Sequence, residues 1–355
     1  MLMNYDTLKN PEAFAKIITQ NPEMFSIFQY IESISPTLQP VLVTGETGVG
    51  KELIAKCIHR ISCVKGSLVI VNVAGLDDNV FSDTLFGHVR GAFTGADKNR
   101  RGLVEQAADG ALFLDEIGDL SHASQVKLLR LLQEGEYLPL GQDDSKKTDA
   151  YIITATNEDL WKLQRAGKFR KDLNFRLRTH HVHIPPLRER TDDIPLLVDY
   201  FLEEAAQILG KKKPTPPKEL FMLLRTYSFP GNIRELRAMV FDAVSRHKSR
   251  LLSLDVFKAH IAREQESRTM AMEPEVDENS PFRHLRELPT IKHSTRLLVA
   301  EAMRRAGGNQ SIASKMLGIS QPALSKRLKN ENERIRKQKA AIDKKKAGKS
   351  RKAST

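Results

Sequence analysis

The chain has 355 residues, 40% of them hydrophobic, which is enough to build more than one packed core. It holds only two cysteines, Cys57 and Cys63, too few for a disulfide framework or a zinc site, and we expect both to be small buried residues. The N-terminus has no signal pattern, and no apolar run approaches the roughly 18 residues that cross a bilayer, so we expect a cytoplasmic protein.

The net charge of +12 is concentrated at the C-terminal end. From Lys326 to Thr355 there are thirteen Lys and Arg residues against three Asp and Glu residues, which leaves +10. Such an excess indicates a polyanionic partner, for which double-stranded DNA is the natural candidate. We expect residues 331–355 to form a disordered basic tail, and such a tail still attracts phosphate.

After a short leader (1–12), apolar β-branched runs alternate with helical patterns. This alternation predicts an α/β region, residues 13–190, with a parallel sheet and crossover helices. The runs are Val41–Thr44, Leu68–Val73, Ala111–Leu114 and Tyr151–Ala155.

The pattern then becomes purely helical. It predicts a smaller helical domain (191–262), a polar linker (263–290) and a second helical module (291–330). The helices expected in the smaller domain are Asp193–Leu209, Lys218–Thr226, Asn232–Arg246 and Ser253–Ala262.

A glycine-rich stretch follows the first apolar run. Its glycines allow the backbone to curl so that N–H groups point inward at a phosphate, and Lys51 adds a charge for the β- and γ-phosphates. The spacing fits a P-loop, although Glu52 stands where that motif usually has a Mg²⁺-binding Ser or Thr. Alone, the stretch also fits an ordinary glycine-rich turn. The expected nucleotide-binding residues are Gly45, Glu46, Thr47, Gly48, Val49, Gly50, Lys51 and Glu52.

The third apolar run ends in two carboxylates, Asp115 and Glu116. Paired acids at a strand end can form a solvated turn. After a P-loop, we interpret Asp115 as the ligand of hydrated Mg²⁺ and Glu116 as the group that polarises the attacking water. The two motifs together predict an ATP-hydrolysing site.

Between these motifs lies a hexapeptide with an aromatic residue and a threonine between two glycines. We expect a flexible loop that holds Phe93 at its tip. An exposed Phe lowers solubility unless it docks on a partner, and the alternative is a turn whose Phe packs back on its own core. The six residues are Gly91, Ala92, Phe93, Thr94, Gly95 and Ala96.

The last helical module reads as a helix-turn-helix. A helix around Leu297–Met303 ends before Gly307 and Gly308, and a second helix over Gln310–Gly318 carries the small Ala313 where two helices cross. The third helix is basic, and the alternative is a plain three-helix bundle with a solvated face. The side chains expected to contact DNA are Gln321, Ser325, Lys326, Arg327 and Lys329.

With these motifs, the chain resembles the AAA+ activators of sigma-54-dependent transcription, also called bacterial enhancer-binding proteins. The resemblance runs from Ala13 to Ala262 and resumes at the last module, which is similar to the Fis-type domain. It rests most on the hexapeptide, which matches the family signature at every position. Members typically carry Glu after the P-loop lysine, as Glu52 does here. The implied fold is an AAA+ P-loop α/β subdomain with a helical lid, followed by an all-α helix-turn-helix domain.

The resemblance also implies roles for single residues. Asn72 corresponds to the residue that couples Glu116 to the γ-phosphate, and Thr156 with Asn157 corresponds to sensor I. Arg170 and Arg176 lie in a segment that resembles the arginine-finger region, where guanidinium from a neighbouring subunit neutralises charge on the phosphoryl group. Arg234 corresponds to sensor II. Ordinary surface arginines are the alternative for all three.

Departures from the family pattern concern communication between subunits. Pro139 replaces an Arg before a hairpin, Ala150 replaces an Arg before the sensor I strand, and Phe229 replaces a Trp. None is a primary catalytic group.

The resemblance implies an ATP-dependent activator, with ATP and Mg²⁺ as cofactors, that oligomerises from dimers to hexamers on upstream DNA and moves the hexapeptide against sigma-54. No receiver domain fits before residue 13, so we expect control by a regulatory protein in trans or by expression level. The rival interpretations are a DNA-binding repressor with a vestigial ATPase and an AAA+ remodeller of another kind, such as a helicase loader.

Overall fold

The computed structural model describes residues 7–247, 251–271 and 289–329. The chain divides into two units, Met1–Thr269 and Met270–Thr355, and each is described by itself. Within the described residues, no helix is both long enough and apolar enough to span a membrane. The expected basic tail and most of the expected linker lie outside the described residues.

The first unit is built on a five-stranded sheet in which every pair of neighbouring strands is parallel. The four predicted strands form as β1 (Val41–Thr44), β2 (Leu68–Asn72), β5 (Ala111–Asp115) and β8 (Tyr151–Thr156). The fifth strand, β9 (His180–His183), was not expected from the sequence. The order β2-β5-β8-β1-β9 confirms the predicted α/β fold class.

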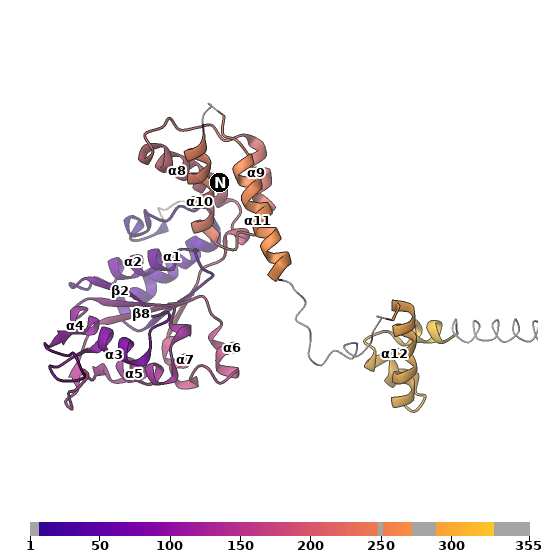
Figure 1. Ribbon diagram of the computed structural model, residues 1–355, viewed down its shortest axis with the longest axis horizontal. Helices are drawn as coiled ribbons and strands as arrows, with labels where there is room; N and C mark the ends of the chain where they lie inside the picture. Colours follow the sequence, from indigo (N-terminus) through magenta and orange to yellow (C-terminus); the bar gives the residue numbers. More distant parts are fainter. Residues whose placement is uncertain (1–6, 248–250, 272–288, 330–355) are drawn as a thin grey trace, which may run out of the picture. The chain divides into compact units, whose positions relative to one another are not determined.

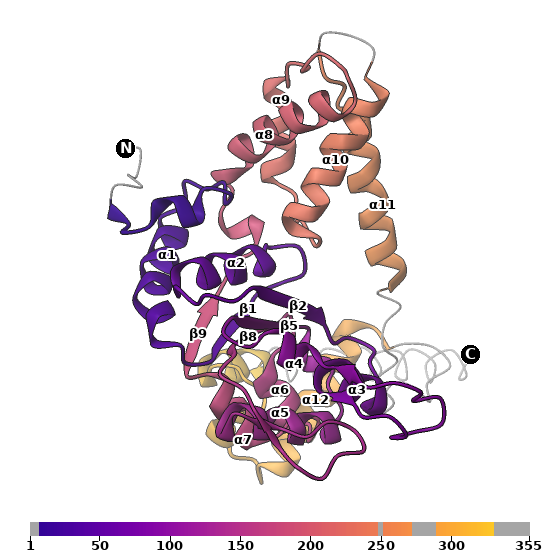
Figure 2. The same ribbon diagram turned by 90° about the vertical axis from the view of Figure 1, so that its left-hand side faces the viewer.

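Helices cover both faces of the sheet because alternate side chains of each strand point to opposite faces. Val41 and Val43 of β1 pack with one layer, and Leu42 packs with the other. Helices α1 and α2 lie on the first face, and α3, α5 and α7 lie on the second (Figures 1 and 2). These helices are α1 (Pro22–Ile34), α2 (Lys51–Ile61), α3 (Asp78–Phe86), α5 (His122–Glu134) and α7 (Lys171–Leu177).

Shorter elements complete this subdomain. Two small antiparallel hairpins are present. β3 pairs with β4 between α3 and α4, and β6 pairs with β7 after α5. These elements are η2 (Pro11–Phe14), η3 (Ser35–Thr37), β3 (Gly87–His88), β4 (Arg100–Arg101), α4 (Leu103–Gln106), η4 (Ile117–Asp119), β6 (Glu136–Tyr137), β7 (Lys146–Lys147), α6 (Leu160–Arg165) and η5 (Leu187–Glu189).

The helical lid follows as four helices around their own apolar core. They are α8 (Asp193–Ile208), α9 (Lys218–Arg225), α10 (Asn232–Arg246) and α11 (Asp255–Ala271). The predicted linker start at residue 263 is wrong, because α11 continues to Ala271. The segment after residue 262 contains no Gly or Pro before Pro274, so nothing in it stops a helix.

Two smaller expectations also need correction. The described part of the leader packs on the domain: Leu8 is buried, and the backbone N–H groups of Lys9 and Asn10 donate to the Glu32 carboxylate. Cys57 is buried as expected, but Cys63 is exposed. The reason is that α2 ends at Ile61, so Cys63 lies in a left-handed turn outside the helix.

The second unit holds α12 (Ile291–Arg305), α13 (Gln310–Met316) and a helix over 321–329. Its small core is centred on Ala302, Ala313 and Leu324. Ala313 is fully buried, in agreement with the close helix crossing expected there. Asn309 caps α13 by accepting hydrogen bonds from two backbone N–H groups of its first turn.

Candidate functional site

The residues expected to handle nucleotide collect at the carboxyl edge of the sheet, where ligands bind in open parallel sheets. β1 leads into the P-loop, β2 ends at Asn72, β5 ends at Asp115, and β8 ends at Thr156. A pocket of about 350 Å³ opens at this edge. It is lined by Thr47, Gly48, Gly50, Lys51, Glu52, Leu53, Asn72, Asp115, Glu116, Ile233 and Arg234.

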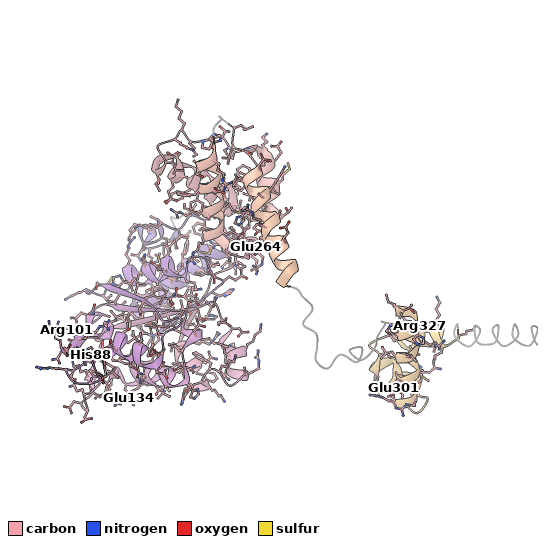
Figure 3. All side chains as sticks on the ribbon, viewed as in Figure 1. His88, Arg101, Glu134, Glu264, Glu301 and Arg327 are labelled. Carbon is pink, nitrogen blue, oxygen red and sulfur yellow. The ribbon has the colours of Figure 1, made fainter. Side chains whose placement is uncertain are left out.

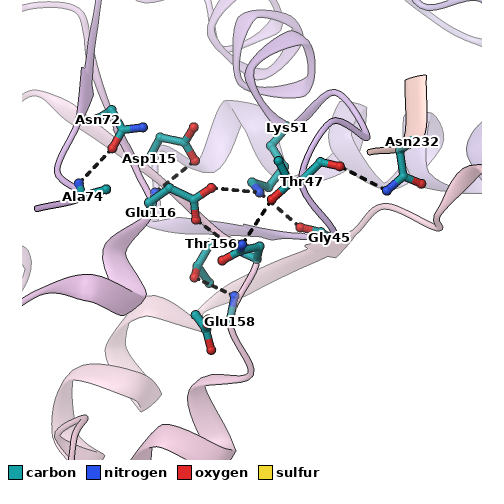
Figure 4. A network of polar contacts seen from close by, with 11 residues as sticks. Gly45, Thr47, Lys51, Asn72, Ala74, Asp115, Glu116, Thr156, Glu158 and Asn232 are labelled. Carbon is teal, nitrogen blue, oxygen red and sulfur yellow. Dashed lines mark hydrogen bonds and ion pairs between the residues drawn. The ribbon is translucent and has the colours of Figure 1, made fainter. Parts of the chain in front are cut away.

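The glycine-rich stretch adopts a conformation that requires its glycines. Gly48 and Gly50 have φ of 80° and 108°, in the left-handed region, and α2 begins directly after them at Lys51. The helix N-terminus therefore faces the loop and favours an anion. Lys51 is only 6% exposed; its Nζ donates to the Gly45 carbonyl at 3.1 Å and lies 3.5 Å from Glu116 Oε1 (Figure 4).

The two carboxylates differ in their surroundings. Burial, and next the negative charge of Glu116, raises the pKa of Asp115, while Lys51 acts in the opposite direction. Glu116 has a φ of 60°, which is unusual for a non-glycine residue and typical of strained functional sites. Its Oε2 accepts a hydrogen bond from the backbone N–H of Asn157 at 3.3 Å. A partly desolvated carboxylate beside a phosphate loop is a suitable ligand for Mg²⁺ together with water and phosphate oxygens.

The expected sensor residues are only partly brought together. The Asn157 amide donates to Thr47 Oγ1 at 3.2 Å, so Asn157 connects the P-loop with Glu116. Thr156 is fully buried, and its hydroxyl accepts from the backbone N–H of Glu158. Asn72 lines the pocket, but its amide oxygen accepts from Ala74 N at 2.8 Å, and among the described residues it makes no hydrogen bond to Glu116 (Figure 4).

The three arginines fall into two groups. Arg234, on α10, lines the pocket as expected. Arg170 pairs with Asp172 on the surface, with Nη2 at 2.7 Å from Oδ2, and Arg176 Nε donates to the Leu132 carbonyl at 3.0 Å. Neither Arg170 nor Arg176 lines the pocket of its own chain.

A second pocket, of about 430 Å³, was missed from the sequence. It shares Gly50, Leu53 and Ile233 with the first pocket, and its walls come from the segment before α1, the P-loop helix and the lid. Its mostly apolar walls suit a flat heterocyclic base. No local pattern marks these residues, because they lie far apart in the chain. The other members are Lys16, Ile17, Ile18, Met24, Val49, Ile54, Ile184, Arg190, Leu197, Tyr200, Phe201, Glu204 and Arg237.

The hexapeptide forms a tight loop beyond β3 and β4. Gly91 and Gly95 have φ of 85° and 98°, and the Gly91 N–H donates to the Ala96 carbonyl, which closes the loop. Phe93 is 47% exposed, and its ring lies edge-on to His88 with centroids 5.0 Å apart. The structure therefore lies between the two expectations, because Phe93 touches a neighbour but keeps half its surface open.

The base of this loop is tied to α3 and to the second hairpin. Asp83 of α3 bonds to both His88 Nδ1 and Arg100. Leu140 exchanges backbone hydrogen bonds with Gly87 and Val89. The Pro139-Leu140-Gly141 segment, which differs from the family pattern, therefore supports the loop directly. A Cβ at Gly141 would lie 2.6 Å from Ala92 Cβ. His88 and Arg101 lie at the same end of the α/β subdomain (Figure 3).

In the second unit, the expected DNA-contacting residues lie on the helix over 321–329, and all five are exposed, among them Arg327 (Figure 3). Ser325 donates to Gln310 Oε1 at 2.6 Å, so its hydroxyl is engaged within the unit. Leu324 is buried on the opposite face of the same helix. One face thus carries the core and the other carries groups able to contact bases and phosphates.

The sheet, P-loop, paired carboxylates and lid define an ATP-binding AAA+ protein, and the second unit adds a helix-turn-helix. Family profiles agree. The profile described as Sigma-54 interaction domain matches residues 17–183, that of the AAA+ ATPase lid domain matches 188–274, and that of the Bacterial regulatory protein, Fis family, matches 296–330.

Curated relatives include the DNA-binding transcriptional regulator NtrC of Azospirillum brasilense, which is 36% identical over 333 residues, or 88% of this chain and 69% of that protein. Regulatory protein LuxO of Vibrio cholerae is 43% identical, over 68% of this chain and 46% of LuxO. The anaerobic nitric oxide reductase transcription regulator NorR of Escherichia coli is 46% identical, over 64% of this chain and 46% of NorR. The chain thus spans less than half the length of LuxO and NorR.

Solved structures of NtrX from Brucella abortus are also similar. The complex with ADP has a TM-score of 0.64 at 29% identity, and covers 89% of this chain and 68% of NtrX. The complex with ATP gives 0.63 at the same identity. The chain belongs to the family of sigma-54-dependent transcriptional activators, with an AAA+ ATPase domain and a Fis-type helix-turn-helix.

Proposed function

We propose that this chain hydrolyses ATP and uses the change in its pocket to move the hexapeptide loop against sigma-54, which promotes opening of the promoter. The observation that carries the proposal is the course of α3. This helix begins six residues after Asn72, at the pocket, and ends at the hairpin that bears the loop. Asp83 ties the helix to both strands of that hairpin.

The pocket residues fit the chemistry of ATP hydrolysis. The P-loop and the α2 N-terminus bind the phosphates, and Lys51 neutralises charge on the β- and γ-phosphates. Asp115 would hold Mg²⁺ together with water, and the ion would supply neutralisation of the phosphate charge. Glu116 accepts the proton of the attacking water, and Asn157 keeps the Glu116 carboxylate in place. The base enters the apolar second pocket.

Two arginines act on a neighbouring subunit. Arg170 and Arg176 lie outside their own pocket, so they supply charge only if a second copy brings them to it. This requirement supports association of at least two copies, and a head-to-tail contact that closes would give a ring, which we propose to be a hexamer. Arg170 must then exchange its surface partner Asp172 for phosphate, a small cost for an exposed pair.

The loop and the DNA module complete the cycle. The half-exposed Phe93 leaves its edge-on contact with His88 and docks on sigma-54, with Thr94 beside it. The helix over 321–329 enters the major groove of upstream DNA as part of a two-fold pair. We assign this module to anchoring the protein on DNA.

Transcription from a sigma-54 promoter tests the proposal. We expect wild type to support open complexes with ATP, and Thr94→Ala to abolish them while ATP hydrolysis continues. Ser311→Ala, an exposed hydroxyl in the second unit, serves as a matched control that keeps full output. Equal output from wild type and Thr94→Ala contradicts the loop's role. Repression of the target promoter, with no ATP hydrolysis by wild type, favours the rival DNA-binding repressor.

A further inference from the structure

The outer side of the P-loop is bound by the lid and by the segment that leads into it. Four consecutive P-loop residues, 46–49, each accept hydrogen bonds from this side, through what we term the lid clamp: Arg188, Arg190, Asn232 and Ile233. In a P-loop the N–H groups turn inward to the phosphate, which leaves the carbonyls outward and in need of donors. Here the carbonyls of Thr47, Gly48 and Val49 find those donors on the lid side.

The individual contacts are short and specific. Arg188 forms a bidentate pair with the Glu46 carboxylate at 2.7 and 2.8 Å. The Asn232 amide donates to the Thr47 carbonyl at 3.1 Å (Figure 4), and it also donates to Glu46 Oε2 at 3.1 Å. The Ile233 N–H donates to the Gly48 carbonyl, and Arg190 Nη2 donates to the Val49 carbonyl, again at 3.1 Å.

Asn232 is built into this position at a conformational cost. It is fully buried with a φ of 50°, a left-handed conformation that Asn tolerates better than most residues. Its Oδ1 accepts from Leu187 N at 2.8 Å, so three of its four hydrogen-bonding positions are used. A Cβ at Gly48 would lie 2.2 Å from the Gly231 carbonyl, so the lid turn and the P-loop are in direct backbone contact.

Arg190 extends the clamp to a third segment. It is 1% exposed, and its Nη1 lies 3.9 Å from Asp193 at the start of α8. Asp193 in turn accepts from Thr19 Oγ1 and Gln20 N, both at 2.7 Å. Such a buried pair adds little stability over apolar side chains of similar size. Its effect is geometric, because it joins the segment before α1, the P-loop and the lid.

We infer that Asn232 and Arg190 are positioning residues that hold the P-loop in its phosphate-binding shape from outside. The inference rests on the proposed ATPase function and names residues beyond those that face the nucleotide. If the outer carbonyls lose these donors, the loop relaxes and binds phosphate less tightly. The coupling is reciprocal, so bound phosphate also fixes the lid.

Binding of ATP by the full chain tests Asn232. Asn232→Asp keeps the shape but removes both donors and places a second carboxylate beside Glu46 and Arg188. We expect the Kd for ATP to rise at least about tenfold near pH 8. Towards about pH 6 the rise shrinks, because the buried carboxyl takes up a proton and donates again. Asn232→Ala weakens binding at both pH values. Arg246→Gln is the control: it removes an exposed ion pair with Asp242 on the same helix, and we expect the Kd for ATP to stay unchanged.

A double variant tests Arg190 where the single one fails to fold. Arg190→Met with Asp193→Leu removes both buried charges, so we expect the Tm to recover towards wild type. The Kd for ATP remains raised if Arg190 positions the loop. A wild-type Kd in this folded double variant, or in folded Asn232→Asp, overturns the inference. Wild type that binds ATP without hydrolysing it contradicts the proposed function instead, so the two failures are distinguishable.

Discussion

The nucleotide pocket and the surface that carries Arg170 and Arg176, here called the finger face, differ in how their functional side chains are placed. In the pocket, Lys51, Glu116 and Asn157 already contact one another or the P-loop. On the finger face, Arg170 and Arg176 are held by local partners, and neither lines the pocket. On the proposed mechanism, a single chain binds the nucleotide but lacks the charge that speeds hydrolysis, which a neighbouring copy supplies.

The largest effect is expected inside the pocket. Lys51→Ala removes the buried cation between the Gly45 carbonyl and Glu116, so we expect loss of ATP binding and a fall in hydrolysis of at least about 100-fold. Lys65→Ala, an exposed lysine just beyond the same helix, is the matched control. Retained hydrolysis in folded Lys51→Ala would place the active site elsewhere.

On the finger face, the loss should spare binding. Arg170→Ala or Arg176→Ala lowers hydrolysis by about 10³-fold, while the Kd for ATP stays within a few-fold of wild type. Mixing either variant with Glu116→Gln sharpens the comparison, because some mixed sites combine an intact finger with an intact Glu116. Recovery of hydrolysis on mixing supports action between subunits. If mixing restores nothing, the fingers act within one chain or not at all.

A third prediction separates stability from catalysis within the pocket. The pKa of Asp115 is raised, so its ionised form is disfavoured in the folded state. The resulting loss of stability is absent below the ordinary Asp pKa and complete above the raised value. Asp115→Asn should therefore raise the Tm at neutral pH and lower hydrolysis. Thermal melts at about pH 7 check this, and a lower Tm for the variant contradicts the assigned burial cost.

The smallest effect concerns His181, which lies between the P-loop strand and the segment that follows α7. His181 Nδ1 accepts a hydrogen bond from Arg178, just after α7, and its Nε2 lies 2.8 Å from Thr44 Oγ1, just before the P-loop. Burial, then Arg178 and His183, lowers the pKa of His181 to about 4. The unfolded chain takes up a proton near the ordinary value of 6.5 and the folded chain does not, so stability falls as the pH drops from 6.5 towards 4.

Denaturant unfolding across this pH range measures the contribution of His181 to stability. We expect the free energy of unfolding of wild type to fall by about 2 kcal/mol more than that of His181→Gln, after allowance for the partial exposure of the ring. Parallel slopes for the two proteins would mean that His181 is solvated in the native state. His122→Gln, which replaces an exposed histidine at the start of α5, is a control that keeps the wild-type slope.

Sequence reasoning succeeded where a pattern is local. Four strands are apolar runs, and the P-loop, the paired carboxylates and the third helix of the last module have fixed spacing. β9 was missed because His180, His181 and His183 read as polar, although their rings find partners in the fold. The lid clamp and the second pocket are assembled from distant segments, so no window of the sequence shows them. The position of Phe93 at the tip of a loop was predictable, but its contact with His88 depends on the β3–β4 hairpin.

The measurement closest to the central claim is capture of sigma-54 by the assembled protein with magnesium, ADP and a phosphate transition-state mimic. We expect a stable complex with wild type in the presence of the mimic, none with ADP alone, and none with Thr94→Ala. Hydrolysis without mimic-dependent capture, or capture that ignores the nucleotide, would contradict a loop driven by this pocket.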